Sequence, residues 1–185
     1  MRTVSLLLLL CGLAVAGTPA TVENFTLTDY NGKKVSLTDF KDAKAIVLMF
    51  VATECPVSNA YNGRYNALAA EYGARNVAFI GINSNKAESA QAVKEHAKEH
   101  GFTFPILKDE KNVIADRLDA QRTPEIYVLH PSSRAVLYHG RIDDSQREER
   151  ITSRDLAAAL NEILAGKPVT VTETKAFGCT IKRVN

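Results

Sequence analysis

The chain has 185 residues, with 23 basic and 21 acidic side chains and a formal charge of +2. This near balance gives no strongly basic or acidic character, so charge offers no basis for binding nucleic acid or an anionic membrane surface. The length fits one domain with a hydrophobic core of its own.

The first 16 residues have the composition of a secretory signal peptide. Arg2 supplies a positive charge, a leucine-rich run follows, and Ala14-Val15-Ala16 offers small residues for cleavage after Ala16, with Ala20 as the alternative end. The apolar run is too short to cross a bilayer comfortably. We therefore expect an exported mature chain, periplasmic or extracellular, with no stable insertion in a membrane.

We expect the mature chain to have two cysteines. Cys11 lies in the signal peptide and is removed with it, which leaves Cys55 and Cys179. An exported protein occupies a compartment that permits disulfides, so these two thiols have to be explained together.

The N-terminal part of the mature chain predicts a hairpin and then a buried strand. Two short strands flank residues 29–32, where Asn31-Gly32 favours the positive φ angles of a hairpin turn. Residues 45–51 are seven consecutive apolar residues, a pattern typical of a strand buried on both faces, as in a parallel sheet.

Cys55 follows this strand after a short turn at Thr53 and Glu54, and Pro56 favours the first turn of a helix expected to continue through Tyr72. At the start of a helix, unpaired N–H groups and the helix dipole favour an anion, which lowers the pKa of a thiol. The position predicts a reactive thiolate. The alternative is a cysteine that packs as a small apolar residue.

The rest of the chain alternates strands and helices and ends in a tail. We expect strands at 77–82, 104–107, 125–129 and 135–138. We expect helices at 87–100, capped by Ser84 or Asn85, at 113–118, and from a cap at Thr152 or Ser153 through Leu164. Residues 143–152 are polar and predict a solvated loop, and residues 167–185 form a tail that carries Cys179.

Three segments carry a resemblance to a known superfamily. Residues 50–56 resemble the active-site segment of thioredoxin-like proteins, residues 25–40 resemble the N-terminal hairpin of the alkyl hydroperoxide reductase/redoxin (peroxiredoxin-like) group, and residues 122–125 resemble the cis-proline loop. The similarity extends over roughly residues 25–164. It implies an α/β thioredoxin-like fold at 22–166, with a central mixed β-sheet flanked by helices, an N-terminal β-hairpin and a C-terminal tail extension.

The resemblance implies a thiol oxidoreductase of the antioxidant type that acts through Cys55, with no cofactor and no metal. Thioredoxins have a second cysteine three residues on, where this chain has Ser58. Ser58 can hydrogen-bond a Cys55 thiolate but cannot form a disulfide. Peroxiredoxins carry a threonine three residues before their reactive cysteine, where this chain has Ala52, with Thr53 one residue closer. The charge of Glu54 opposes a thiolate unless it points to solvent.

The resemblance also implies that Thr123-Pro124 is a cis peptide opposite Cys55, with the Thr123 backbone facing a substrate thiol or an extended peptide. Arg122 either stabilises a thiolate or a bound peroxide, or is a solvated arginine. His139 ends a strand and could approach the site. His96 and His100 have a spacing that can hold a metal, but charged neighbours favour a solvated helix face.

Cys179 leaves three arrangements open: an intramolecular disulfide with Cys55, an intermolecular disulfide, or a free buried thiol. Phe177 and Ile181 could anchor the tail, and Gly178 allows a close backbone approach. Some peroxiredoxins likewise keep a resolving cysteine near the C-terminus, an arrangement that this tail resembles loosely.

Three functions follow in order of preference. The first is an exported thiol-disulfide oxidoreductase acting through Cys55 on protein or small-molecule thiols and disulfides. The second is a thiol peroxidase for hydroperoxides, in which Cys55 is oxidised to a sulfenic acid and Cys179 resolves it. The third is a non-catalytic binding module, for example in metal handling.

Overall fold

The computed structural model describes residues 18–184, so the predicted signal peptide and Cys11 lie outside the described residues. The strands are β1 (Thr26–Asp29), β2 (Lys34–Ser36), β3 (Ala45–Phe50), β4 (Val77–Asn83), β5 (Ile106–Lys108), β6 (Arg122–Thr123), β7 (Glu125–Leu129), β8 (Val136–Gly140) and β9 (Cys179–Thr180). The helices are α1 (Pro56–Asn59), α2 (Asn62–Gly73), α3 (Ala90–Glu99), α4 (Val113–Leu118) and α5 (Asp155–Leu164), with short 3-10 turns η1 (Leu37–Phe40) and η2 (Glu148–Arg150).

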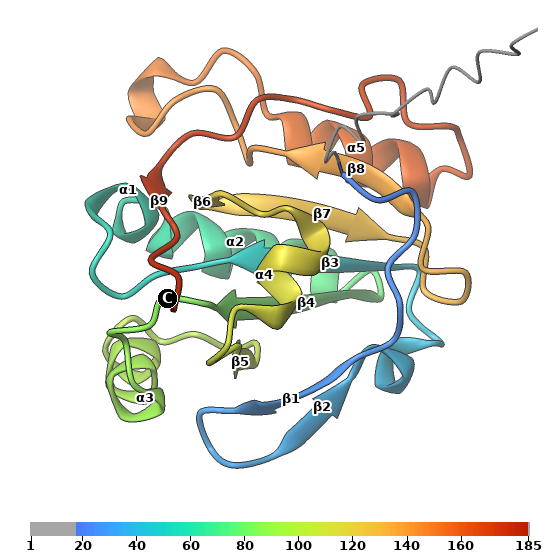
Figure 1. The fold of residues 1–185 in the computed structure, drawn as a ribbon. Coiled ribbons are helices and arrows are strands. Elements are labelled where there is room, and N and C mark those ends of the chain that lie inside the picture. Colours follow the sequence, from blue (N-terminus) through green and yellow to red (C-terminus); the bar gives the residue numbers. More distant parts are fainter. Residues whose placement is uncertain (1–17, 185) are drawn as a thin grey trace, which may run out of the picture.

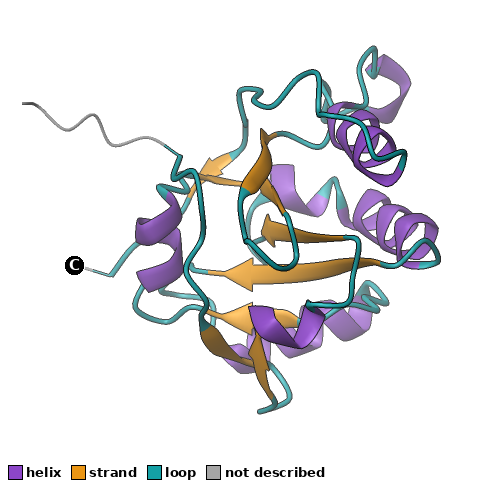
Figure 2. Ribbon diagram, turned by 90° about the vertical axis from the view of Figure 1, so that its right-hand side faces the viewer, coloured by secondary structure: helices purple, strands orange, loops and turns teal. Residues whose placement is uncertain are grey.

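One mixed sheet organises this part of the chain. Its strand order is β2-β1-β5-β4-β3-β7-β8, and a separate small ladder joins β6 to β9 (Figure 1). Helices α2, α3 and α5 cover one face, while α4 and the end of the tail at Ile181 pack on the other, so that helices lie on both sides of the sheet (Figure 2). Strands β2 and β1 form one edge of the sheet. The predicted central mixed sheet with flanking helices is confirmed.

Strand β3 lies at the centre and is buried along its whole length. It pairs in parallel with β4 and antiparallel with β7. Its side chains alternate between the two cores, since Val47 and Met49 pack under α2 and α5, while Ile46 and Leu48 pack on the side of α4. Because both faces are covered, every position is apolar, as the sequence pattern requires.

The hairpin turn forms at the predicted residues, but only one of the two expected positive φ angles is present. Gly32 has a positive φ of 85°, but Asn31 does not. The Asp29 carboxylate instead holds the turn, accepting hydrogen bonds from the backbone N–H groups of Asn31 and Lys33 at 2.8 Å each. An aspartate that bonds backbone two residues on is a common turn former.

The single helix expected from Pro56 to Tyr72 is wrong in one respect, because it is broken between α1 and α2. Tyr61 N donates to Ser58 O, three residues back, at 3.0 Å, which tightens the chain before α2 begins. The Tyr61 hydroxyl donates to Asp143 Oδ1 at 2.9 Å, a contact from a distant loop that local periodicity does not reveal.

Both predicted helix caps are also wrong. Ser89 caps α3 by accepting from Ala92 N at 3.1 Å. Ser84 donates to the Asp109 carboxylate at 2.9 Å instead. Helix α5 begins without a side-chain cap, since the Ser153 hydroxyl donates to Asp155 Oδ1 at 2.6 Å and Thr152 bonds Asp144.

The predicted solvated loop at 143–152 is pinned to α2 at its start. Asp143 is 1% exposed and forms a buried ion pair with Arg64 at 2.6 Å. Arg64 also donates to the carbonyl oxygens of Ser145 and Gln146 and lies over the Tyr61 ring, 3.6 Å from its centroid. One buried arginine therefore fixes the loop, although the loop sequence is polar.

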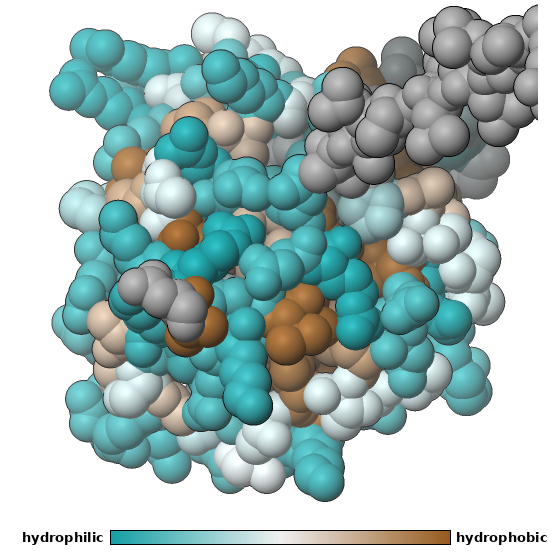
Figure 3. Space-filling view, in the orientation of Figure 1, coloured by the Kyte–Doolittle hydropathy of each residue, from teal (hydrophilic) through white to brown (hydrophobic). Residues whose placement is uncertain are grey.

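The face that carries the tail is largely hydrophilic, with apolar residues gathered in small separate patches (Figure 3). Within residues 18–184, no helix has both the length and the apolar character that crossing a bilayer requires.

We expect Asp143→Ala to lower the free energy of unfolding by about 3–5 kcal/mol, because it leaves the Arg64 charge buried without its partner. Urea unfolding of the oxidised protein at neutral pH measures this loss. Asp42 is the matched control, since its pair with Lys41 is exposed at both ends. Asp42→Ala should change stability by less than about 0.5 kcal/mol. Equal losses in the two variants would contradict a structural role for the buried pair.

Candidate active site

Cys55 lies where β3 ends and α1 begins. It occupies the N-cap position, with Pro56 in the first helical turn, and is 4% exposed. Its Sγ accepts a hydrogen bond from Ser58 N at 3.3 Å. The Thr123 carbonyl oxygen lies 3.3 Å from the same Sγ, where it would accept a hydrogen bond from the thiol of the reduced form.

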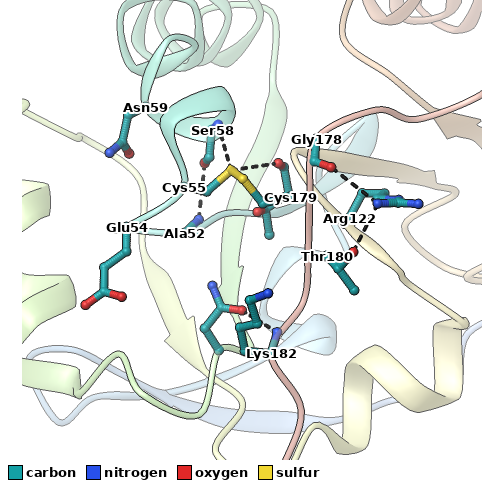
Figure 4. Close-up of a disulfide and its surroundings, with 12 residues drawn as sticks. Ala52, Glu54, Cys55, Ser58, Asn59, Arg122, Gly178, Cys179, Thr180 and Lys182 are labelled. Carbon is teal, nitrogen blue, oxygen red and sulfur yellow. Dashed lines mark hydrogen bonds between the residues drawn. A yellow bond between two sulfur atoms is a disulfide. The ribbon is translucent and has the colours of Figure 1, made fainter.

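Cys55 is joined to Cys179 by a disulfide, with their Cα atoms 6.0 Å apart (Figure 4). The two residues are 124 positions apart in sequence. Of the three arrangements left open by the sequence, the structure has the intramolecular pair.

The tail reaches Cys55 by adding a strand beside the cis-proline loop. The Thr123–Pro124 peptide bond is cis. Strand β9 pairs antiparallel with β6, so that Cys179 stands opposite Thr123 and Thr180 opposite Arg122. The Thr123 backbone thus faces an extended peptide, and that peptide is the chain's own tail. The Thr123 hydroxyl is buried and has no hydrogen-bond partner within the described part of the chain.

Ser58 hydrogen-bonds Cys55 through its backbone N–H and not through its hydroxyl. The Ser58 hydroxyl accepts from Ala52 N at 3.2 Å and lies 3.2 Å from the Tyr65 hydroxyl. It therefore points into the domain core, and the amide N–H takes the role of donor to sulfur.

Arg122 does not reach Cys55 either. Its guanidinium is exposed and donates to Thr180 Oγ1 at 3.0 Å and to the Gly178 carbonyl at 3.4 Å. Figure 4 shows it across the tail from the disulfide, so it binds the tail and not the sulfur of Cys55. Glu54 is exposed and points away from the disulfide, which removes the expected opposition to a thiolate.

Glu88 is a site residue that the sequence analysis missed. It is 3% exposed and accepts hydrogen bonds from the backbone N–H groups of Thr53 and Glu54, at 2.7 and 3.3 Å. These contacts fix the turn that precedes Cys55, and they are made by the backbone of Thr53 and Glu54. Asn83 and Asn85 donate to the same carboxylate, at 2.5 and 2.8 Å.

A signal for Glu88 was present in the sequence. β3 and β4 are neighbouring parallel strands, so their carboxyl ends meet at one edge of the sheet. Ligands and catalytic groups gather at that edge in α/β folds. The polar segment 83–88 directly after β4 therefore marked a second element of the site.

A buried carboxylate also holds the cis-proline loop. Glu125 is 3% exposed and accepts from the N–H groups of Gln121 and Arg122, each at 2.7 Å. His139 Nε2 lies 2.7 Å from Glu125 Oε1, and the Thr18 hydroxyl lies 2.7 Å from His139 Nδ1. His139 thus reaches the cis-proline loop through Glu125 and makes no contact with sulfur.

The two histidines of helix α3 pack against each other and against Phe102. The ring centroids of His96 and His100 are 4.3 Å apart, and His96 packs against Phe102. Both histidines are half-buried, so the predicted solvated face is wrong at these positions. Within residues 18–184, no three His, Cys, Asp or Glu side chains form a group that could hold a metal ion.

Comparison with known proteins identifies the family. Residues 18–139 match the model of the AhpC/TSA family, and the chain belongs to this family. Thiol-disulfide oxidoreductase ResA of Bacillus subtilis is 29% identical over 149 residues, which cover 74% of this chain and 81% of ResA.

Two solved structures are similar over almost the whole chain. An uncharacterized conserved protein from Geobacillus kaustophilus is 34% identical with a TM-score of 0.82, and the match covers 91% of this chain and 93% of that one. A hypothetical protein from Sinorhizobium meliloti is 30% identical with a TM-score of 0.84, covering 92% and 96%. Less similar thioredoxin-like structures share the fold. The thioredoxin-like fold is confirmed, and the similarities support thiol oxidoreductase activity.

The Glu125 contacts predict a pH-dependent contribution to stability. Burial raises the pKa of this carboxyl, but hydrogen bonds from His139 and from the N–H groups of Gln121 and Arg122 outweigh burial and lower the pKa overall. A carboxyl whose pKa falls on folding stabilises the protein above its unfolded pKa, and that contribution is lost as the pH falls through the folded pKa.

Glu125→Gln should therefore lower the free energy of unfolding by about 1–3 kcal/mol at pH 7, and by less as the pH approaches 3. Urea unfolding of both proteins at several pH values measures the difference. A difference that stays constant between pH 7 and pH 3 would show that the Glu125 charge contributes nothing.

Proposed function

We propose that this protein is an exported thiol-disulfide oxidoreductase that acts through Cys55, with Cys179 as its resolving cysteine. The observation that carries this proposal is the Cys55–Cys179 disulfide beside the cis-proline loop. Export is supported by the signal-like composition of residues 1–16. The similarity to ResA, whose name is thiol-disulfide oxidoreductase, supports protein thiols and disulfides as partners.

The first step uses Cys55 as a nucleophile. Its thiolate attacks one sulfur of a substrate disulfide, the substrate S–S bond breaks, and one substrate thiolate leaves while the other half stays bound to Cys55. The Ser58 N–H, 3.3 Å from Sγ, favours the thiolate over the thiol before the attack.

The second step uses Cys179. Its thiolate attacks Cys55 Sγ and releases the remaining substrate thiolate, so that two electrons pass from the cysteine pair to the substrate. The 6.0 Å separation of the Cα atoms lies in the ordinary range for a disulfide, so the second attack needs no movement of the strands. Ser58 cannot perform this step, and Cys179 supplies the thiol that the motif lacks.

Peroxidase activity comes second among the candidate functions. It would need groups that polarise a bound peroxide, and Ala52 stands where peroxiredoxins have threonine. The guanidinium of Arg122 is bonded to Thr180 and Gly178 of the tail. Neither of these two positions offers a group that binds a peroxide, although the same cysteine pair could resolve a sulfenic acid. A purely binding role leaves the disulfide beside the cis-proline loop unexplained.

We expect Cys55→Ser to abolish exchange with a small disulfide such as oxidised glutathione, because the nucleophile is lost. Cys179→Ser should still react once and then remain as a stable Cys55–glutathione mixed disulfide, because no thiol resolves it. Mass spectrometry of the intact variants, together with the rate of glutathione release, distinguishes the two outcomes.

Circular dichroism is the control, since both variants should keep the native spectrum. Full turnover by Cys55→Ser would contradict the assignment of the nucleophile. Rapid loss of glutathione from Cys179→Ser would contradict the assignment of the resolving cysteine.

A further inference from the structure

The tail is attached to the domain upstream of Cys179 by contacts that do not involve the disulfide. Thr174 N donates to His139 O at 2.9 Å, and the Thr174 hydroxyl lies 2.7 Å from that of Tyr138. A side chain at Gly140 would overlap Thr174, because an added Cβ would lie 2.1 Å from its Oγ1. The path of the tail across β8 is therefore built for close contact.

The attachment downstream of Cys179 is denser. Ile181 is 3% exposed, packs in the same core as Ile46 and Leu48, and donates its N–H to Gln121 O at 3.0 Å. The next three residues are held by the loop after β4 and by helix α4 with its N-cap residue. Lys182 N donates to Asn85 Oδ1 at 2.7 Å, Arg183 Nε to Asp116 Oδ1 at 2.7 Å, and Val184 N to Asn112 Oδ1 at 2.6 Å.

These contacts leave the two sulfur atoms in different surroundings. Cys55 is 4% exposed, and its Sγ has Ser58 N and the Thr123 carbonyl oxygen each at 3.3 Å. The edge of β6, where an extended substrate would pair, is taken by β9. Cys179 is half-buried on the two-residue strand β9, next to the exposed Thr180.

We propose that the tail stays docked when the disulfide is reduced, so that protein thiols exchange at Cys179 and only small oxidants reach Cys55. This inference rests on the proposed function and names the class of partner for each sulfur. It departs from the expectation that the Thr123 backbone and Cys55 are open to a protein substrate.

The Cys55–Cys179 disulfide is then reduced by a dithiol reductant that attacks Cys179. One reductant thiolate attacks Cys179 Sγ, the Cys55–Cys179 bond breaks, and Cys55 leaves as a thiolate that accepts the Ser58 N–H. The second thiolate of the reductant then attacks the reductant sulfur that is bound to Cys179. This closes the disulfide of the reductant and releases Cys179 as a thiolate. Two electrons enter the protein and the reductant leaves as a disulfide. A thiolate that is better stabilised leaves faster. The Ser58 N–H stabilises the Cys55 thiolate, so attack on Cys179 with Cys55 as the leaving group is favoured.

Mapping the first mixed disulfide tests which sulfur is attacked. The oxidised wild-type protein is mixed with a reduced thioredoxin whose second active-site cysteine is replaced by serine, quenched at the earliest times with acid and N-ethylmaleimide, and digested for mass spectrometry. We expect the thioredoxin on Cys179 and N-ethylmaleimide on Cys55, at least tenfold above the reverse pattern. Thioredoxin on Cys55 in equal or greater amount would overturn the proposal.

Hydrogen exchange and alkylation test whether the tail stays docked after reduction. In the reduced wild-type protein, the Ile181 amide should exchange at least tenfold more slowly than in an unstructured peptide. Ile181→Asp should speed alkylation of Cys55 by N-ethylmaleimide at least tenfold. Val171→Asp is the matched control, since Val171 is an aliphatic residue of the same tail but is 53% exposed, and it should leave the rate unchanged.

The results separate this inference from the proposed function. An Ile181 amide that exchanges freely after reduction, or equal alkylation in Ile181→Asp and wild type, would overturn the docked tail even if Cys55 still exchanges with disulfides. Absence of any exchange by either cysteine would overturn both proposals. If Ile181→Asp fails to fold, Gly178→Ala serves instead, because an added Cβ would lie 2.1 Å from Thr123 O and displace the tail at that point.

Discussion

The complete burial of β3 is the constraint on which the rest of the structure depends. A strand with apolar side chains on both faces must be covered on both, and this creates two cores: one under α2, α3 and α5, and one under α4, the hairpin and the tail. Because β4 runs parallel to β3, the segments after both strands emerge at one edge of the sheet. Cys55 follows β3 there, and Glu88 follows β4 and holds the turn before Cys55. The position of Cys55 is thus a consequence of how the strand is buried.

The tail completes what the domain alone lacks. The 50–58 segment supplies one thiol, and the second comes from a residue 124 positions further on. Packing of Ile181 and pairing of β9 with β6 hold Cys179 next to Cys55, which gives it a high effective concentration at that site. An intramolecular disulfide is therefore favoured over one between two molecules. Closing so long a loop also lowers the entropy of the unfolded chain. In the chain-entropy treatment this raises the free energy of unfolding by about 5 kcal/mol.

The sequence predicted the features that depend on local pattern and failed where distant residues decide. The run at 45–51, the turn to Cys55 and the proline at 124 were all recognisable, because burial periodicity and short motifs determine them. Asp143 was assigned to a solvated loop because its neighbours are polar, and its burial depends on Arg64, which lies on another element. Arg122 was expected either to stabilise a thiolate or to be solvated. Its exposed guanidinium instead binds Thr180 and Gly178 of the tail, whose position no local pattern indicates.

The two glycines at the crossings of the tail show that it belongs to the architecture of the domain. Gly140 lies at the end of β8 and Gly178 lies in the tail itself, with φ angles of 146° and 148°, where side chains are rarely tolerated. At each position an added Cβ would lie 2.1 Å from an oxygen across the crossing, Thr174 Oγ1 in one case and Thr123 O in the other. A tail that merely lay on the surface would not require glycine at these contacts. Here the domain supplies Gly140 at one crossing, and the tail supplies Gly178 at the other. The backbone of the domain and that of the tail are shaped to meet at both points, and Cys179 follows directly after the second.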